Sequence, residues 1–466
     1  MIRILSAMCA ERADSYPEVK PARHFPFIRR PGFLRGQNIT EKWSSRIAFL
    51  FAAIGAAVGL GSIWRFPAIV GENGGGAYLI PYLVAVFFCA TPLMVLEFAA
   101  GRYFATDIVS AFRSIRPWFT VPAAIICATG FLILSYYLVV TGWTLGFAAF
   151  AATGTPVTFA AFTASYEPVI CFLIATVIAG LIVASGVRNG IERVSTLLIP
   201  FIVILLLVMA FFVATLPGFS VGIAYLSTPD FSVIARPSLW ISAIGQSFFT
   251  LSIGLGILFT YGAYLEKDEN LLTSSLIISG SDLAISLLSG IVIFPIVFSF
   301  GLAPAMGAQL AFSTLPQAFA VMPYGRVIAI AFFLLLFLTA ILSSIAMVEV
   351  LAAVVIKRTG WSRPRSCAIV TMAIILAGLP AALSYSSMNL TLAGVRILDA
   401  MDSLVGTAGI VISAILTSLV ISWYVDQKTI ESGIGSHSPM VRWVVPMCRT
   451  VIPLVLGVIL VITLIT

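Results

Sequence analysis

Charged side chains are scarce in this chain of 466 residues, because Asp, Glu, Lys and Arg together make up only 10% of it. Soluble globular domains carry roughly 25% charged residues, so an ordinary water-soluble domain and a disordered chain are both excluded. The formal net charge of +7 is spread over a long chain, whereas nucleic-acid binders concentrate basic residues in patches. We therefore expect no nucleic-acid partner.

Residues for metal binding and nucleophilic catalysis are also few. The chain has two histidines, His24 and His437, and six cysteines scattered mostly through apolar stretches. The cysteines show neither the paired spacing of a zinc site nor a disulfide framework. No phosphate-binding loop or nucleophile motif occurs. These absences argue against an enzyme and against a resident metal or organic cofactor.

Long apolar stretches dominate the chain, and 60% of its residues are hydrophobic. A helix needs roughly 20 mostly apolar residues to cross a bilayer, and the shorter alternating segments of a membrane barrel do not recur. The sequence therefore predicts an all-α polytopic membrane protein with about eleven transmembrane helices. We place them near residues 46–70, 75–101, 118–151, 167–186, 191–216, 238–264, 270–301, 326–356, 366–384, 396–424 and 446–466.

The distribution of Lys and Arg predicts the orientation of these spans, since cytoplasmic loops carry the excess of basic residues. With the N-terminus in the cytoplasm, only Arg236, Arg326 and Arg396 fall outside, and Arg65 lies within the first span. We expect a multi-pass protein of the plasma (inner) membrane. Residues 1–45 are polar and basic, and they form its cytoplasmic N-terminal tail.

Two spans contain clusters of glycine at mid-membrane depth. The clusters are Gly55, Gly59 and Gly61 in the first span, and Gly245, Gly254 and Gly256 in the sixth. Glycine disfavours helix by about 1 kcal/mol relative to alanine, and unwound backbone is tolerated in a membrane only where it lines an enclosed cavity. Close helix packing is the alternative explanation, but corresponding positions in two sets of five spans favour an inverted-repeat transporter.

Several segments carry a resemblance to a known family. They include EKWSSRIAFLFAAIGAAVGLGSIWRFPAIVGENGGGAYLIPYL in the first two spans, YYLVVTGWTLGF, GIERVSTLLIP, GQSFFTLSIGLG, TLPQAF, SSIAM and LDAMDSLVGT. With these motifs the chain resembles the neurotransmitter:sodium symporters, in particular the bacterial leucine-transporter-like branch. The resemblance implies a 5+5 inverted repeat, with one repeat at about 46–216, the other at about 238–424 and an extra helix at about 446–466. In that fold helices 1 and 6 are unwound at mid-membrane.

The resemblance also implies a substrate site between the broken helices. Its positions here are Ala57, Leu60, Gly61, Ile133, Tyr137, Phe249, Thr250, Ser252, Leu255, Ser343 and Met347. The physical chemistry suits a zwitterion, because free amides near Leu60 and Gly61 favour a carboxylate and the Tyr137 hydroxyl can donate to it. Leu255 stands where the leucine transporter has a larger aromatic residue, which leaves room for a bulkier substrate side chain.

Two ion sites are implied, and both depart from the family pattern. The first site corresponds to Ala57, Thr250, Ser62 and Ser281, and the second to Gly55, Val58, Thr339 and Ser343. Ser62 and Ser281 replace two asparagines of the family. At the second site Leu342 replaces a hydroxyl residue, so one oxygen ligand of a hard cation is lost. A matching chloride position, Ile285, has no hydroxyl, which argues against chloride dependence.

The gates are implied by the same resemblance. Arg65 and Asp402 correspond to the outer gate, and an intramembrane arginine is expected to have a functional partner. The inner ion pair of the family is excluded, since its positions hold Thr40 and Lys357. Closure of the protein on its cytoplasmic side must then depend on side-chain packing or on another ion pair.

Three acidic residues within the spans are candidates for proton coupling, because burial favours the protonated carboxyl. They are Glu97, Asp282 and Glu349, and protonated structural hydrogen bonds are the alternative explanation for them. In animal members of the family acids at the Glu97 and Glu349 positions lie close, so the two could share a proton.

We expect a secondary active transporter that carries a small neutral, hydrophobic amino acid by alternating access. Its partners are the amino acid, sodium or protons, and the lipid bilayer. Coupling to sodium through altered ion sites is the first hypothesis. The alternatives are a proton-coupled or uncoupled amino-acid transporter, and a non-transporting sensor on the same fold.

Overall fold

The computed structural model describes residues 41–266, 268–302, 310–434 and 441–465. Nearly all of the predicted N-terminal tail, with Thr40 and His24, and also His437, lies outside the described residues. Within the described part, nine helices are long and apolar enough to cross a membrane, or ten when one bent pair is counted as a span. The all-α polytopic prediction is confirmed, while the count of eleven spans stays a prediction.

In the first half of the chain the helices follow one another with short connections. They are α2 (Arg46–Ala57), the π-helical turn η1 (Gly61–Arg65), α3 (Phe66–Glu72), η2 (Gly75–Tyr78), α4 (Leu79–Val84), η3 (Ala85–Ala90), α5 (Thr91–Phe104), α6 (Ile108–Ile115), η4 (Pro117–Phe119), α7 (Thr120–Thr153), α8 (Phe159–Ala164), α9 (Glu167–Ala184), η5 (Val187–Glu192), α10 (Arg193–Val213), α11 (Phe219–Ser227) and η6 (Phe231–Val233).

The second half is also helical apart from one small β-hairpin. Its elements are α12 (Pro237–Thr250), α13 (Ile257–Ala263), α14 (Leu271–Ser299), η7 (Leu310–Thr314), α16 (Leu315–Val321), α17 (Gly325–Thr359), α18 (Arg363–Leu383), β1 (Thr391–Leu392), β2 (Val395–Arg396), α19 (Ile397–Met401), η8 (Asp402–Gly409), α20 (Ile410–Tyr424), α21 (Gln427–Ile434), α22 (Val441–Pro446), η9 (Met447–Val451) and α23 (Ile452–Ile465).

The first predicted span is interrupted where its glycines gather. Helix α2 begins at an N-cap in which the Ser45 side chain accepts from the Ala48 amide, and it ends at Ala57. The chain resumes at η1, and the two helical segments meet at an angle of 55°. A Cβ added at Gly59 would lie 2.6 Å from Ser343 Oγ, so only glycine lets α17 approach the break this closely.

The sixth predicted span is interrupted as well, over residues 251–256 between α12 and α13. Gly254 and Gly256 have φ angles of 81° and 76°, and Ser252 joins them in the left-handed region at 53°. A Cβ at Gly254 would meet the backbone nitrogen of Ala414 at 2.7 Å. Gly245 belongs instead to the regular helix α12, so the break depends on the other two glycines of the cluster.

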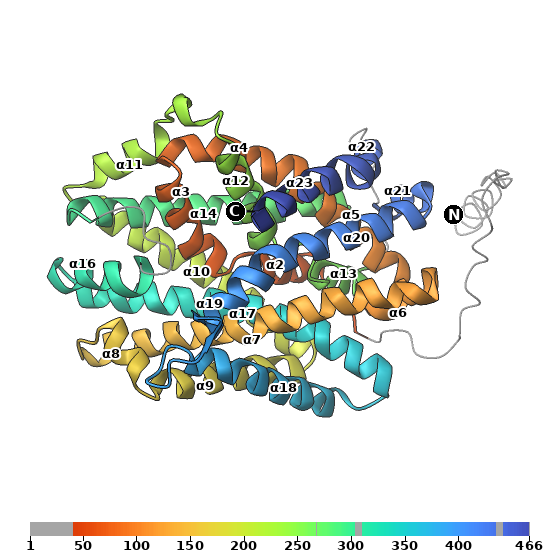
Figure 1. Cartoon of the computed structure of the whole chain (residues 1–466), viewed down its shortest axis with the longest axis horizontal. Helices are drawn as coiled ribbons and strands as arrows, with labels where there is room; N and C mark the ends of the chain where they lie inside the picture. Colours follow the sequence, from red (N-terminus) through yellow and green to blue (C-terminus); the bar gives the residue numbers. More distant parts are fainter. Residues whose placement is uncertain (1–40, 267, 303–309, 435–440, 466) are drawn as a thin grey trace, which may run out of the picture. The chain divides into compact units, whose positions relative to one another are not determined.

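The two longest helices, α7 and α17, are distant in sequence but lie side by side, as Figure 1 shows. Helix α2 contacts α10, α14 and α17, and α13 is buried along its whole length. By contrast α10 presents large apolar side chains outward, such as Phe211 at 82% exposure and Leu197 at 71%. The core therefore surrounds the broken helices, and an apolar outer surface is left for lipid.

Candidate functional site

A small cavity of about 30 Å³ lies where the two helix breaks face α7, α17 and α20. Its lining residues are Ala57, Gly59, Gly61, Ile133, Tyr137, Phe249, Thr250, Ser252, Leu255, Ser343, Met347 and Ile410. Every predicted substrate position except Leu60 is among them. Because about 10–15 Å³ of such space holds one water molecule, the cavity has room for only about two or three waters.

Two lining residues, Gly59 and Ile410, were not among the predicted positions. Gly59 belongs to the glycine cluster of the first span, so its place in the break was a usable signal. Ile410 is the first residue of α20, and no local pattern distinguishes it from the other apolar residues of that span. Its position is a product of tertiary packing.

One hydrogen bond links the first helix break to Tyr137, which lines this cavity. The Leu60 amide donates to the Tyr137 hydroxyl at 3.1 Å, and this amide belongs to the start of the second half of the broken helix. On the opposite side of the break the Ser252 hydroxyl donates to the Ala56 carbonyl at 2.9 Å. Because Tyr137 and Ser252 both line the cavity, these two bonds place two hydroxyl groups on its wall.

Beside the cavity lies a buried polar cluster around Asp282. The Ser62 hydroxyl donates to Asp282 Oδ1 at 2.5 Å, and both side chains are fully buried. Ser281, the residue predicted for the first ion site, is only half-buried, and no hydrogen bond joins its side chain to Ser62 in the described part of the chain. One residue along α14 turns the side chain by about 100°, so Asp282 takes the position expected for Ser281.

Three buried polar atoms of this cluster have no hydrogen-bond partner among the described residues. They are Asp282 Oδ2, Gln246 Oε1 and Ser286 Oγ. The Gln246 amide nitrogen donates to the Gly61 carbonyl at 2.8 Å, which fixes the side chain beside the break. Buried polar atoms without a partner call for an ion, a proton or a water. Ser286 is fully buried and lies about one helical turn from Asp282 along α14.

At the second predicted ion position several protein oxygens and one leucine lie close together. The Ser343 hydroxyl lies 3.5, 3.3 and 3.5 Å from the carbonyl oxygens of Gly55, Ala56 and Val58. Leu342 is buried beside Gly55, where an added Cβ would be 3.4 Å from its Cδ1. The hydroxyl of Thr339 donates to carbonyls of its own helix at 3.0 Å.

The predicted outer-gate pair is not formed in this structure. The Arg65 guanidinium lies 4.3 Å from the centre of the Phe249 ring, and the Asp402 carboxylate accepts a hydrogen bond from Tyr136 at 2.9 Å. The ion pairs of the described residues do not include Arg65 or Asp402. An aromatic face and a hydroxyl therefore take the places of the two opposite charges.

The end of the bundle that carries Trp43 and Arg363 is held together by a network that the sequence did not reveal. Arg363, at the start of α18, forms an ion pair with the buried Glu349 of α17 and a second with Glu41 at 3.5 Å. Glu349 also accepts from the Tyr264 hydroxyl. Trp43 is buried against this group, and its amide donates to the Tyr264 carbonyl at 3.3 Å. One arginine thus ties α17, α18 and the segment before α2 together.

The two acids that were predicted to share a proton have different partners. Glu97 accepts from the Gly254 amide at 2.7 Å through Oε1, so it stabilises the break between α12 and α13. Glu349 bonds instead to Arg363 and Tyr264. No hydrogen bond joins the two carboxyl groups in the described residues. Of the three candidates, Asp282 alone is in the cluster beside the predicted substrate cavity.

Comparison with known proteins gives consistent matches over nearly the whole chain. The model of the sodium:neurotransmitter symporter family matches residues 40–167 and 158–466. The sodium-dependent transporter YhdH of Bacillus subtilis is 33% identical over 439 residues, which are 88% of this chain and 96% of the relative. The sodium-dependent transporter MJ1319 of Methanocaldococcus jannaschii is 32% identical, with 82% of each chain covered.

A solved structure agrees with these relatives. The crystal structure of MhsT in complex with L-phenylalanine superimposes with a TM-score of 0.83 at 34% sequence identity. The match covers 90% of this chain and 99% of MhsT. The fold is therefore that of MhsT, a fold of multi-pass membrane transporters rather than of enzymes.

Proposed function

Because this chain belongs to the sodium:neurotransmitter symporter family, we propose that it carries a hydrophobic L-amino acid across the membrane by alternating access, coupled to one cation bound beside Asp282. The transported molecule occupies the central cavity between the two helix breaks. The protein acts in the plasma (inner) membrane with its N-terminus in the cytoplasm, and the two repeats, about 46–216 and about 238–424, move relative to one another.

The observation that carries this proposal is the convergence of both helix breaks on one cavity with two hydroxyl groups on its wall. Freed backbone groups inside a membrane protein are expensive unless they bind a ligand or each other. The Tyr137 hydroxyl accepts from the Leu60 amide and keeps its own hydrogen to donate to a carboxylate, and Ile133, Leu255 and Met347 form an apolar wall. The related MhsT was crystallised with L-phenylalanine, which supports an aromatic or large aliphatic side chain.

The buried Asp282 supports the choice of a cation as the coupled ion. A carboxylate in a dry interior is costly without a compensating charge, and its Oδ2 atom has no partner among the described residues. Sodium bound to this oxygen, to Ser62 and to freed carbonyls would neutralise it. A proton on Asp282 would do the same, so proton coupling is the second candidate. The fixed negative charge also disfavours an added chloride at this point.

The number of ions carried in each transport cycle depends on whether the second predicted ion position binds an ion. Leu342 and the Ser343 hydroxyl fill the space between α2 and α17, and sodium needs several oxygen ligands in an open shell. We therefore propose one coupled ion per cycle. Opening toward the cytoplasm requires the pair of Arg363 with Glu41 to separate, since it joins α18 of the second repeat to the segment before α2.

Uptake into proteoliposomes tests the proposal. The purified protein is reconstituted, and uptake of radiolabelled L-phenylalanine and L-leucine is measured with a sodium gradient, with choline, and with choline plus an inward proton gradient. Sodium-driven accumulation supports the first candidate, and proton-driven accumulation in choline supports the second. Leu255→Trp, which fills the central cavity, is the control that should abolish uptake.

The same vesicles separate transport from sensing. Counterflow of labelled amino acid without any ion gradient requires a full transport cycle. Sodium-dependent ligand binding without counterflow would contradict transport and would leave the sensor hypothesis.

A further inference from the structure

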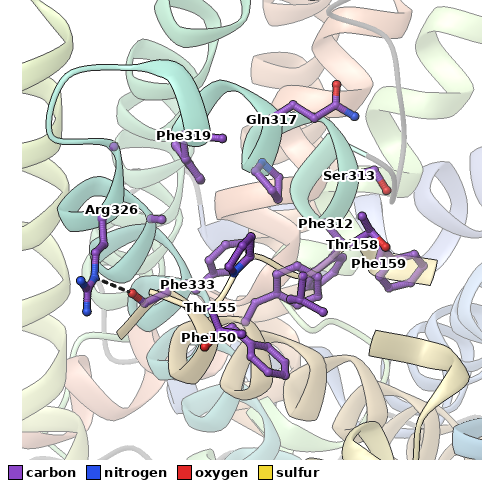
Figure 2. Close-up of a pocket in the computed structure, with 18 of the residues that line it drawn as sticks. Phe150, Thr155, Thr158, Phe159, Phe312, Ser313, Gln317, Phe319, Arg326 and Phe333 are labelled. Carbon is purple, nitrogen blue, oxygen red and sulfur yellow. Dashed lines mark hydrogen bonds between the residues drawn. The ribbon is translucent and has the colours of Figure 1, made fainter. Parts of the chain in front are cut away.

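A second cavity of about 850 Å³ lies between the end of α7, the segment that leads into α8, the η7–α16 region and the start of α17, as Figure 2 shows. It shares no lining residue with the central cavity. Small-molecule sites are typically about 300–1,000 Å³ and are mostly apolar with a few polar groups. By the basic-residue rule this end of the bundle faces outward.

Aromatic rings make up the walls of this second cavity. The phenylalanines in its lining are Phe147, Phe150, Phe159, Phe312, Phe319 and Phe333. The Phe312 ring stacks on Phe159 at 5.7 Å and on Phe333 at 6.2 Å between centroids. Aromatic rings prefer offset or edge contacts with other rings. These walls therefore suit a ligand with a compact apolar part, and an aromatic ring best of all.

The charge of the cavity is supplied by one residue. Arg326 is the single charged side chain in the lining, and no carboxylate accompanies it there. Its Nε and Nη2 atoms donate to the carbonyls of Ala151 and Ala152 at 3.2 and 2.6 Å, at the end of α7. These bonds hold the guanidinium at the rim, and the ion pairs of the described residues do not include it. A fixed, unneutralised guanidinium selects an anion, most readily a carboxylate.

We propose that this cavity is a binding site for a small apolar carboxylate, with the carboxylate at Arg326 and an aromatic body among the phenylalanines. The site stands on its own residues, and it does not depend on the proposed transport function. Two sources share this chemistry: free aromatic acids, and fatty acids released from lipid. The aromatic walls favour the first.

A ligand bound in this second cavity can affect the central cavity through one side chain, that of Phe312. Phe312 is in edge contact with Trp64 at 5.8 Å and with Trp143 at 5.8 Å. Trp64 precedes Arg65, whose guanidinium lies over Phe249 in the central cavity. A ligand that presses on Phe312 therefore acts on the outer side of the first broken helix without entering the central cavity.

Calorimetric titration of the purified full-length protein tests the site with three probes: 3-phenylpropionate, its neutral amide, and octanoate. All lack the ammonium group of an amino acid. We expect 3-phenylpropionate to bind about tenfold more tightly than the amide, since a hydrogen bond to a charged group is worth about 1.5 kcal/mol or more. Octanoate should bind more weakly than 3-phenylpropionate, and the reverse order would overturn the aromatic assignment.

Matched variants locate the bound probe. Arg326→Gln should remove the preference for the carboxylate, while Arg326→Lys should keep most of it. Ala320→Trp adds a ring to an exposed lining position and should abolish binding, whereas Leu255→Trp in the central cavity should leave binding unchanged. Gel filtration checks that each variant is folded. Binding that survives Ala320→Trp but is lost in Leu255→Trp would overturn the proposal, and so would the absence of any binding to the wild-type protein.

Discussion

The two positions beside the first helix break are both expected to hold ions, yet they are built in opposite ways. Around Ser62 the structure gathers a buried carboxylate, one of whose oxygens has no partner among the described residues, and two further polar atoms without such partners. Around Ser343 it places the leucine Leu342 and a hydroxyl that already lies among three carbonyls. We propose that a cation completes the first position and that the second binds none.

The difference shows how one side chain decides whether a gap between helices binds an ion. Burying a leucine is worth about 1.5–3 kcal/mol, so Leu342 stabilises the contact between α2 and α17 in every ionic condition. Burying Asp282 costs free energy unless an opposite charge or a proton compensates it. Under the proposed function, the packing of the broken helix depends on an ion at the first position and is independent of ions at the second.

Asp282→Asn would remove the charge that distinguishes the first position. We expect sodium affinity to fall about tenfold to a hundredfold, because interactions with a buried charged group are worth about 1.5–3 kcal/mol, and sodium-driven uptake to be lost. Sodium-induced shifts of the melting temperature measure the affinity, and Asp230→Asn on an exposed loop is the control. Unchanged sodium affinity would remove the contrast between the two positions.

Ser62→Ala and Ser281→Ala test whether Asp282 or Ser281 of α14 belongs to the first ion position, because Ser62 contacts Asp282. The Ser62 hydroxyl contacts Asp282, so its loss should weaken sodium binding about fivefold to tenfold. Ser281→Ala should change it less than twofold. The same sodium titration applied to both variants decides the matter, and a larger effect at Ser281 would restore the assignment made from the sequence.

Leu342→Thr would supply the missing oxygen at the second position. We expect sodium affinity to rise about fivefold, as one added polar contact is worth about 1 kcal/mol, and the Hill coefficient for sodium-dependent uptake to exceed that of the wild type. Leu342→Val is the matched control, because valine has nearly the shape of threonine without the hydroxyl. Equal behaviour of the two variants would show that space alone, and no new ligand, is responsible.

Ser343→Ala should have the smallest effect. If the second position holds no ion, sodium affinity measured without amino acid stays within twofold of the wild type. The melting temperature should drop by about 1–2 °C, since one internal hydrogen bond contributes about 1 kcal/mol in a large domain. A marked loss of sodium affinity in this variant would mean that the second position binds an ion after all.

The lining of the central cavity was largely predictable from the sequence, whereas the partners of charged groups were not. Glycine clusters locate a helix break by a local property of the backbone, and the positions on α7 and α17 follow from the resemblance to the transporter family. The choice between Ser281 and Asp282 depends on the rotation of α14 about its axis. Matching short motifs can be wrong by one residue, and it does not show which of the two side chains faces Ser62. The partners of Arg65 and Arg363 depend on which distant side chain comes near, and many arrangements satisfy the same charges.

By itself the sequence determined the class of molecule: apolar stretches of membrane-spanning length, two helices broken at glycine, few groups for catalysis, and motifs that resemble one transporter family. These are properties of single segments, since hydrophobicity and backbone freedom act locally. The tertiary structure decided which acid faces the ion position, how one end of the bundle is held together around Arg363, and where six phenylalanine rings meet to form a second cavity. Such features arise only when side chains from distant segments occupy the same volume, and close packing selects one arrangement among many.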